Sequence, residues 1–422
     1  MCSLGKFLIE KKLTREYNDL MKVLVCNTHD GAGGAARAAR RISQGLSLNN
    51  VQNSFFTLEG NGIKKSDSFF FKRTKFFWSR LEQYPKLFYS RNFAAPFSVS
   101  KHSLGYRKYV DVFKPDIINL HYINCGLFSI RDVGLLNKPI VWTLHDSWAF
   151  TGGCHLPLDC TNYKESCGNC PVLNMKKERD LSRYVWKLKK ENWKNLNLTI
   201  VTPSKWLGQC AKESSLFRDS RIETIANPLD SDVFKAIDRQ EARKKLGLDV
   251  NKKYILFGAV DAIRDKNKGF EFLKEALGKI KIKGIELLVF GSKRKENLGL
   301  NIPVRDLGFV ENEKNFATIY SSADVTAIPS ISENSPTIAF ESLSCGTPVC
   351  GFDIGGMKEI VLDKKLGSLA KKYCSDDLAK KIEEILSIEA DRDFLSKYVQ
   401  KNFNLLKIGK EYKELFEDVL KV

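Results

Sequence analysis

No hydrophobic run in this sequence reaches the ~18 residues that a membrane-spanning helix requires. The first twenty residues carry several charges, among them Lys6, Lys11 and Lys12, and do not form the apolar core of a signal peptide. The chain also has no internal repeat and no low-complexity tract. These absences predict a globular, cytoplasmic protein in which residues 1–20 form an extension before the folded body.

Acidic residues are fewer than basic ones. The chain has 50 Asp and Glu and 68 Lys and Arg, which gives a net charge of +18. Such an excess indicates an anionic partner. The stretches 64–80 and 176–194 interleave basic and aromatic residues, and they predict amphipathic elements lying on an anionic membrane surface. The alternative for each stretch is a solvated helix face with core aromatics. Since no nucleic-acid-reading module is present, we expect no nucleic acid partner.

The length of 422 residues exceeds that of one typical domain, and the hydrophobic content of 43% supports two cores. Short apolar strands alternate with helical stretches, a pattern typical of parallel, doubly wound sheets. The predicted strands are 23–26, 51–58, 116–121, 139–145 and 198–202, then 254–257, 285–290, 325–328 and 349–352. We therefore predict an α/β protein with two Rossmann-like domains, 21–227 and 228–404, and a terminal helix over 405–422.

The segment 330–348 places two carboxylates, Glu333 and Glu341, eight positions apart across a predicted junction between a loop and a helix. Ser335 is a favourable N-cap, and Pro336 suits the first helical turn. The free backbone N–H groups and the positive dipole end of such a helix bind anions. An anion site with a carboxylate on each side suits a nucleotide sugar. The alternative is a capped surface helix with solvated acids.

This segment, with the sequence on either side of it, resembles the E-x₇-E motif of retaining family 4 glycosyltransferases, which have the two-domain GT-B fold. The resemblance implies that the two domains face a central cleft and that the terminal helix packs back on the first domain. It implies that Glu341 binds the ribose hydroxyls and that Glu333 contacts the transferred sugar. It also assigns donor contacts to the residues that follow Glu333, namely Asn334, Ser335, Pro336 and Thr337.

A glycine-containing loop follows the first predicted strand, and Gly33 and Gly34 allow its backbone to approach a phosphate or a sugar. The rival interpretation is a nicotinamide dinucleotide site, but the glycine spacing departs from G-x-G-x-x-G. In the resembled family this loop faces the donor diphosphate and the acceptor, which assigns both glycines to donor binding.

The resemblance also identifies polar residues for catalysis. Lys268 matches a family lysine that neutralises the donor diphosphate, Arg264 is a second candidate cation, and Lys266 could substitute for it. Fixed cations stabilise the charge that builds on the leaving diphosphate. A metal ion could do the same, but the resembled family uses side chains and the helix terminus, which implies that the chemistry requires no cofactor. His145 matches the family histidine that reaches the donor sugar, and His121 is a weaker candidate. The alternatives are a solvated basic loop and a structural histidine.

Four of the eleven cysteines form a cluster of their own: Cys154, Cys160, Cys167 and Cys170. The last two form a C-x-x-C knuckle, which predicts a structural zinc site, while a thiol redox pair is the alternative. Disulfides are not expected in a reducing cytosol. The stretch 145–170 resembles a subgroup of family 4 enzymes from bacterial exopolysaccharide and O-antigen biosynthesis, including colanic-acid-type transferases. The insertion 154–170 is expected beside the acceptor cleft.

Together these features predict a retaining transferase that moves a hexose-type sugar from a UDP or GDP donor to a lipid-linked or saccharide acceptor. We expect it to serve surface polysaccharide biosynthesis at the inner membrane face. Two alternatives remain open, which are a catalytically silent scaffold of polysaccharide assembly and a nicotinamide-dependent enzyme.

Overall fold

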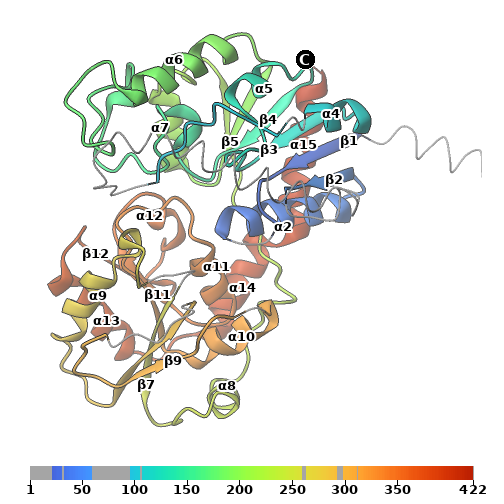
Figure 1. The fold of residues 1–422 in the computed structure, drawn as a ribbon. Helices are drawn as coiled ribbons and strands as arrows, with labels where there is room; N and C mark the ends of the chain where they lie inside the picture. The colour runs from blue at the N-terminus through green and yellow to red at the C-terminus, as the bar shows by residue number, and fades with distance from the viewer. Residues whose placement is uncertain are drawn as a thin grey trace, which may run out of the picture.

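The computed structural model describes residues 21–30, 33–58, 96–104, 107–258, 263–291, 298–310 and 312–421. The extension 1–20 and the basic aromatic stretch 64–80 lie outside these residues. The described residues form two α/β domains stacked one above the other, with the chain passing from the first to the second near the middle of the sequence (Figure 1).

The first domain is built on a parallel six-stranded sheet with the strand order β2-β1-β3-β4-β5-β6. Its strands are β1 (Lys22–Cys26), β2 (Gln52–Phe56), β3 (Ile117–Leu120), β4 (Ile140–Thr143), β5 (Leu198–Thr202) and β6 (Arg221–Thr224). Helices lie on both faces of the sheet, which explains why every residue of β3 and β4 is buried. The order reverses beside β1, and ligands bind at such switch points.

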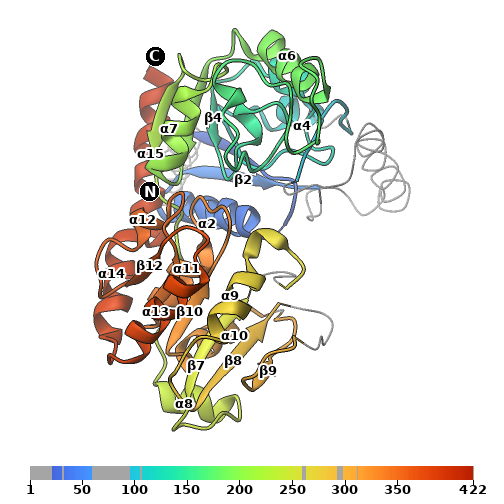
Figure 2. The same ribbon diagram turned by 90° about the vertical axis from the view of Figure 1, so that its left-hand side faces the viewer.

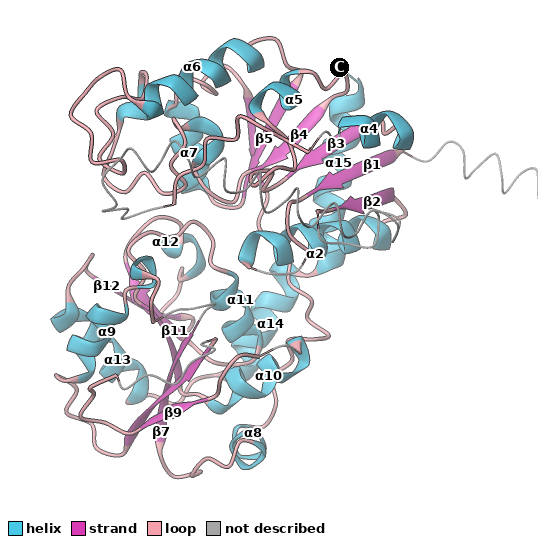
Figure 3. Ribbon diagram, viewed as in Figure 1, coloured by secondary structure: helices cyan, strands magenta, loops and turns pink. Residues whose placement is uncertain are grey.

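The second domain repeats this plan with the strand order β12-β11-β10-β7-β8-β9, again all parallel. Its strands are β7 (Lys253–Gly258), β8 (Ile285–Phe290), β9 (Val304–Asp306), β10 (Val325–Ile328), β11 (Val349–Phe352) and β12 (Gly367–Ala370). In Figure 3 each sheet lies among helices in its own domain. The predicted fold class, two Rossmann-like doubly wound domains, is confirmed.

Helices connect the strands in both domains. The first domain contains α2 (Gly34–Leu48), α4 (Arg107–Phe113), α5 (Ile130–Gly134), α6 (Leu181–Trp193) and α7 (Lys205–Glu213). The second contains α8 (Arg239–Lys245), α9 (Phe270–Leu277), α10 (Glu313–Ser322), α11 (Thr337–Ser344), α12 (Met357–Ile360), α13 (Ser375–Leu386) and α14 (Arg392–Phe403).

The last helix, α15 (Leu405–Lys421), leaves the second domain and packs along the first (Figure 2). It crosses α2 at two glycines, where a Cβ atom added to Gly409 would lie 2.2 Å from the carbonyl oxygen of Gly45. The buried side chains of Tyr412 and Phe416 join a core cluster with strands of the first sheet. The Tyr412 hydroxyl lies 3.1 Å from Thr143 Oγ1, so α15 is tied to β4.

The basic aromatic stretch 176–194 forms α6 and the turn before it. Its tryptophans, Trp186 and Trp193, are buried in the core of the first domain rather than exposed. Lys189 is also buried and donates to the carbonyl of Thr151 at 3.0 Å. The two tryptophans of this stretch therefore serve packing, as the alternative interpretation proposed, whereas Tyr184 is exposed. Among the helices that the structure describes, none is long and apolar enough to cross a membrane.

Candidate active site

A cavity of about 340 Å³ lies between the two domains, at the carboxyl ends of strands from both sheets. Most of the residues predicted for catalysis or donor binding line it, namely Gly33, Gly34, His145, Lys268, Glu333, Asn334, Ser335, Pro336 and Thr337. The residues that line the cavity do not include Arg264, Glu341 or the clustered cysteines. Some of their neighbours in sequence do line it. Segments separated by up to 300 positions thus form one site.

Two helix N-termini point into this cavity. Helix α2 begins at Gly34 after Gly33, whose φ of 89° favours glycine, and no side chain caps its amides. Helix α11 begins at Thr337, one residue later than predicted, and again no side chain caps it. A Cβ atom on Gly34 would lie 3.9 Å from Thr337 Oγ1, so the two ends are neighbours. Their dipoles and free N–H groups favour an anionic ligand between them.

Lys268 and Glu333 form an ion pair at the cavity wall, with 2.7 Å between Lys268 Nζ and Glu333 Oε1. Ser330 Oγ donates to the same carboxylate oxygen at 2.9 Å. The side chain of Asn267 bonds the backbone of Ser332 through both its amide nitrogen and its oxygen, which joins the two loops. Burial lowers the pKa of Lys268, but Glu333 outweighs this and raises it, so the lysine keeps its positive charge.

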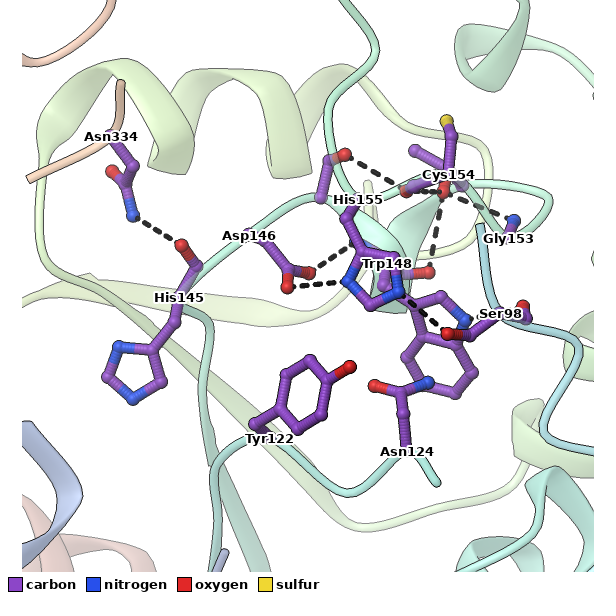
Figure 4. Close-up of polar contacts among 12 residues, drawn as sticks. Ser98, Tyr122, Asn124, His145, Asp146, Trp148, Gly153, Cys154, His155 and Asn334 are labelled. Atoms are coloured by element: carbon purple, nitrogen blue, oxygen red, sulfur yellow. Dashed lines mark hydrogen bonds and ion pairs between the residues drawn. The ribbon is translucent and has the colours of Figure 1, made fainter. Parts of the chain in front are cut away.

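Asn334 connects the domains beside His145 (Figure 4). Its side-chain nitrogen donates to the carbonyl oxygen of His145 at 3.3 Å, and its oxygen accepts from Ser204 Oγ. The His145 ring nitrogen Nε2 lies 2.9 Å from Nδ1 of His121, which is buried beneath it. Burial lowers the pKa of His145 to about 4, against the opposing charge of Asp146. His145 is therefore a neutral imidazole at neutral pH.

A second polar chain runs through Asp146, His155 and Ser98 (Figure 4). Asp146 Oδ2 lies 2.7 Å from His155 Nδ1, and His155 Nε2 lies 2.9 Å from Ser98 Oγ. Burial raises the pKa of Asp146, but His155 and the backbone N–H of Trp148 outweigh this and lower it. The arrangement resembles a catalytic triad, with Ser98 in the place of the nucleophile, His155 in that of the base and Asp146 in that of the orienting acid. Because both ring nitrogens of His155 are engaged and Ser98 does not line the cavity, the chain braces the segment 154–157.

Glu341 is buried inside α11 and reaches across the domain interface rather than into the cavity. Its Oε1 accepts from Arg41 Nη2 at 2.9 Å and lies 3.8 Å from Arg37 Nη1. Its Oε2 accepts from the Tyr320 hydroxyl at 2.9 Å. Since Glu341 is fully buried and does not line the cavity in this conformation, the ribose contact stays a prediction.

Three cavity-lining residues each have a buried polar atom without a hydrogen-bond partner in the described protein, and sequence reasoning missed two of them. Arg37 Nε, Asn227 Oδ1 and Ser335 Oγ are these atoms, and only the role of Ser335 was predicted. Buried polar groups are normally paired, so these atoms are available to bind a ligand or water in the cavity. The available signal for Arg37 was its position one turn after Gly33. Trp206, at the start of α7, is a further missed lining residue.

Arg264 lies on an exposed turn outside the cavity lining, whereas Lys268 lines the cavity, and so does Arg37. The four clustered cysteines line a separate, much smaller hollow within the first domain. The backbone N–H of Gly152 donates to Cys167 Sγ at 3.0 Å, and all four thiols are free. Across the described residues, no group of three or more His, Cys, Asp or Glu side chains is arranged to hold a metal ion. The zinc site therefore stays a prediction.

Comparison with known proteins agrees with this architecture. Residues 32–233 match the model of the family described as Glycosyltransferase Family 4, and residues 238–402 match that of Glycosyl transferases group 1. The D-inositol 3-phosphate glycosyltransferase of Mycobacteroides abscessus is 29% identical over 182 residues, which cover 40% of this chain and 39% of that protein. The chain therefore spans about two fifths of the length of the curated relatives it matches.

Solved structures share the fold across nearly the whole chain. Sucrose-phosphate synthase from Thermosynechococcus elongatus has a TM-score of 0.65 at 16% identity, covering 95% of this chain and 99% of that one. HepE from Anabaena, solved with UDP and glucose, has a TM-score of 0.58 at 16% identity, covering 94% and 100%. Two parallel-sheet domains around a shared cavity, together with these structural matches, define the GT-B fold. The two family matches cover one domain each, Glycosyltransferase Family 4 over the first and Glycosyl transferases group 1 over the second.

Proposed function

We propose that this chain is an active, retaining glycosyltransferase that moves a hexose-type sugar from UDP or GDP to a lipid-linked or saccharide acceptor. The observation that carries the proposal is the interdomain cavity, where two uncapped helix N-termini lie beside Lys268. This arrangement provides fixed positive charge for a diphosphate. The neighbouring Glu333 and His145 supply hydrogen-bonding groups for a sugar. The binding of UDP and glucose by HepE, a protein of the same fold, supports this choice of donor.

The proposed reaction breaks the bond between the anomeric carbon and the diphosphate oxygen, and the acceptor oxygen bonds to that carbon from the same face. The acceptor proton passes to the leaving phosphate oxygen. Lys268 and the two helix ends stabilise the negative charge on the diphosphate, and loss of one such group lowers turnover by about 10²-fold to 10³-fold. Glu333 is held by Lys268 and Ser330, which suits a group that positions the sugar rather than a nucleophile.

For the acceptor, we propose a lipid-linked or saccharide substrate of bacterial surface polysaccharide biosynthesis, reached at the cytoplasmic face of the membrane. We propose that the segment 154–170 contributes to acceptor binding, because its residues His155, Leu156 and Pro157 border the cavity from the first domain. The net charge of +18 would favour an anionic membrane surface. The curated relatives are named for an inositol phosphate acceptor, so a phosphorylated polyol is the comparison substrate to assay.

The test is calorimetric binding of UDP, GDP and NAD to the full chain, followed by donor turnover with the nucleotide that binds. We expect one nucleoside diphosphate to bind and Lys268→Ala to weaken that binding, while Lys266→Ala, at an exposed position nearby, does not. Binding of NAD alone would overturn the proposal in favour of a nicotinamide enzyme. Absence of nucleotide binding, or binding without release of nucleoside diphosphate from its sugar, would favour a silent scaffold.

A further inference from the structure

A continuous chain of hydrogen bonds lies beneath the sugar side of the cavity. Asn119 Oδ1, at β3, lies 2.8 Å from His121 Nε2, and His121 Nδ1 lies 2.9 Å from His145 Nε2. The two imidazole rings are stacked, with 5.2 Å between their centroids and an interplanar angle of 17°. Asn119 and His121 are buried, whereas His145 lines the cavity. The chain therefore leads from the core of the first sheet to the site.

The orientation of the Asn119 amide is determined by its other contacts. Its nitrogen Nδ2 lies 2.9 Å from the carbonyl oxygen of Val141 and 3.2 Å from Thr143 Oγ1. A backbone carbonyl only accepts hydrogen bonds, so the amide nitrogen must be the atom that faces it. The amide oxygen consequently faces His121, and because that oxygen also only accepts, His121 Nε2 must carry a proton.

The protonation of both histidines then follows. Burial, with a smaller contribution from His145, lowers the pKa of His121 well below its usual value, and burial lowers that of His145 to about 4. Both rings are therefore neutral at neutral pH, with one protonated nitrogen each. Since His121 carries its proton on Nε2, its Nδ1 accepts, and His145 must donate from Nε2. His145 Nδ1 is left without a proton and without a hydrogen-bond partner among the described residues.

We infer that Asn119 and His121 are positioning residues that fix His145 in the Nε2–H tautomer, so that His145 Nδ1 accepts a hydrogen bond from a hydroxyl of the donor sugar. The identity of the ligand in this inference rests on the proposed function, whereas the tautomer of His145 follows from the hydrogen bonds within the protein. A neutral acceptor nitrogen suits a sugar hydroxyl, whereas it offers no proton to a phosphate or a carboxylate. His145 therefore selects the hydroxyl-bearing part of the donor, and Lys268 and the helix ends take the diphosphate.

Nitrogen-15 NMR of histidine-labelled protein tests the tautomer without any ligand. The chain has only five histidines, and comparison with His145→Gln assigns the signals of His145. We expect a protonated Nε2 and an unprotonated Nδ1 between about pH 6 and pH 8 in the wild type. A proton on His145 Nδ1 would overturn the inference. His102→Gln, at an exposed residue, is the matched control and should leave the signals of His145 unchanged.

Two variants of His121 separate positioning from structural support. His121→Phe keeps a stacked ring but loses the acceptor, so the fixed tautomer of His145 should be lost; His121→Asn keeps an oxygen near the Nδ1 position and should preserve it. With UDP-glucose or GDP-mannose, whichever the wild type turns over, we expect His121→Phe to raise the donor KM about tenfold, with a smaller change in kcat. An unchanged tautomer in folded His121→Phe would overturn the inference. If neither donor is turned over, the proposed function fails while the NMR result still decides the tautomer.

Discussion

The buried carboxylate of Glu341 provides the sharpest test of how the two domains are held together. Burial raises its pKa, but Arg37, Arg41 and the Tyr320 hydroxyl together outweigh this and lower it. Arg41 makes the shortest of the charged contacts, at 2.9 Å, and its own side chain is 4% exposed. The change Arg41→Met would retain much of the apolar stem and remove the charge, which leaves Glu341 dependent on Arg37 at 3.8 Å.

Breaking a buried ion pair by removing one partner costs about 3–5 kcal/mol, because the remaining charge is left in a poorly solvated site. With Arg37 as partial compensation, we expect Arg41→Met to lose about 3 kcal/mol of unfolding free energy. For domains of about 200 residues, this corresponds to a fall in Tm of roughly 6–12 °C. Glu341→Gln in the same chain should recover much of the loss, because it removes the stranded charge.

The dependence on pH has a definite sign. In the wild type the lowered pKa of Glu341 contributes stability above the carboxyl's unfolded pKa, and this contribution is lost as the pH falls. Without Arg41, burial becomes the larger influence and the folded state holds its proton more tightly than the unfolded state. The deficit of Arg41→Met should therefore be larger at pH 8 than at pH 5.

The assay is thermal and urea unfolding of the full chain at both pH values. Arg40→Leu is the matched control, since Arg40 is the adjacent residue of α2, is 44% exposed and pairs with Asp30 at the surface. Exposed pairs contribute about 0–1 kcal/mol. A loss below about 1 kcal/mol for Arg41→Met, or a loss equal to that of Arg40→Leu, would refute the reasoning about the buried charge.

Three further predictions concern other parts of the molecule. Lys268→Ala should lower donor turnover by about 10²-fold while exposed Lys266→Ala stays near the wild type, and similar rates would remove Lys268 from the diphosphate site. Because the folded pKa of His145 is about 4, below its unfolded value of 6.5, the stability that it contributes is present above pH 6.5 and falls by up to about 3 kcal/mol toward pH 4. Acid unfolding of His145→Gln should show a shallower slope. Zinc analysis of protein purified without added metal should give about one equivalent if the four clustered cysteines bind zinc. A content far below one equivalent would contradict the predicted zinc site.

The sequence predicted the fold best where a strand is buried on both faces. The strands β3, β4, β8 and β10 are buried along their whole length and consist mainly of apolar residues, and each was predicted close to its observed place. The missed strands, β6, β9 and β12, lie at sheet edges, where one side of the strand has no neighbour. Most of their side chains are exposed or only partly buried, and several are polar, so neither an apolar run nor a clean alternation marks them.

The site divides in the same way between local and distant information. Gly33, Lys268 and Glu333 belong to short segments whose residues are recognisable in sequence, and the cavity brings them together. The pairing of Glu341 with Arg41 joins residues 300 positions apart, and no local pattern announces it. Similarly, the contact between His121 and His145 depends on β3 and β4 being neighbours in the sheet. Residues with a chemical role could be recognised from short local segments, whereas their contact partners in distant segments could be identified only from the folded structure.

The return of α15 to the first domain has a consequence for the order in which the chain matures during synthesis. One face of the first sheet, including Val25 and Val141, is covered by a helix that the ribosome delivers only after the second domain. Until those residues emerge, the first domain exposes an unfinished apolar surface even though its own strands are complete. The amino-terminal half can therefore finish folding only after the carboxyl-terminal half has been made, and a chain cut short before α15 would be a target for chaperones and proteases.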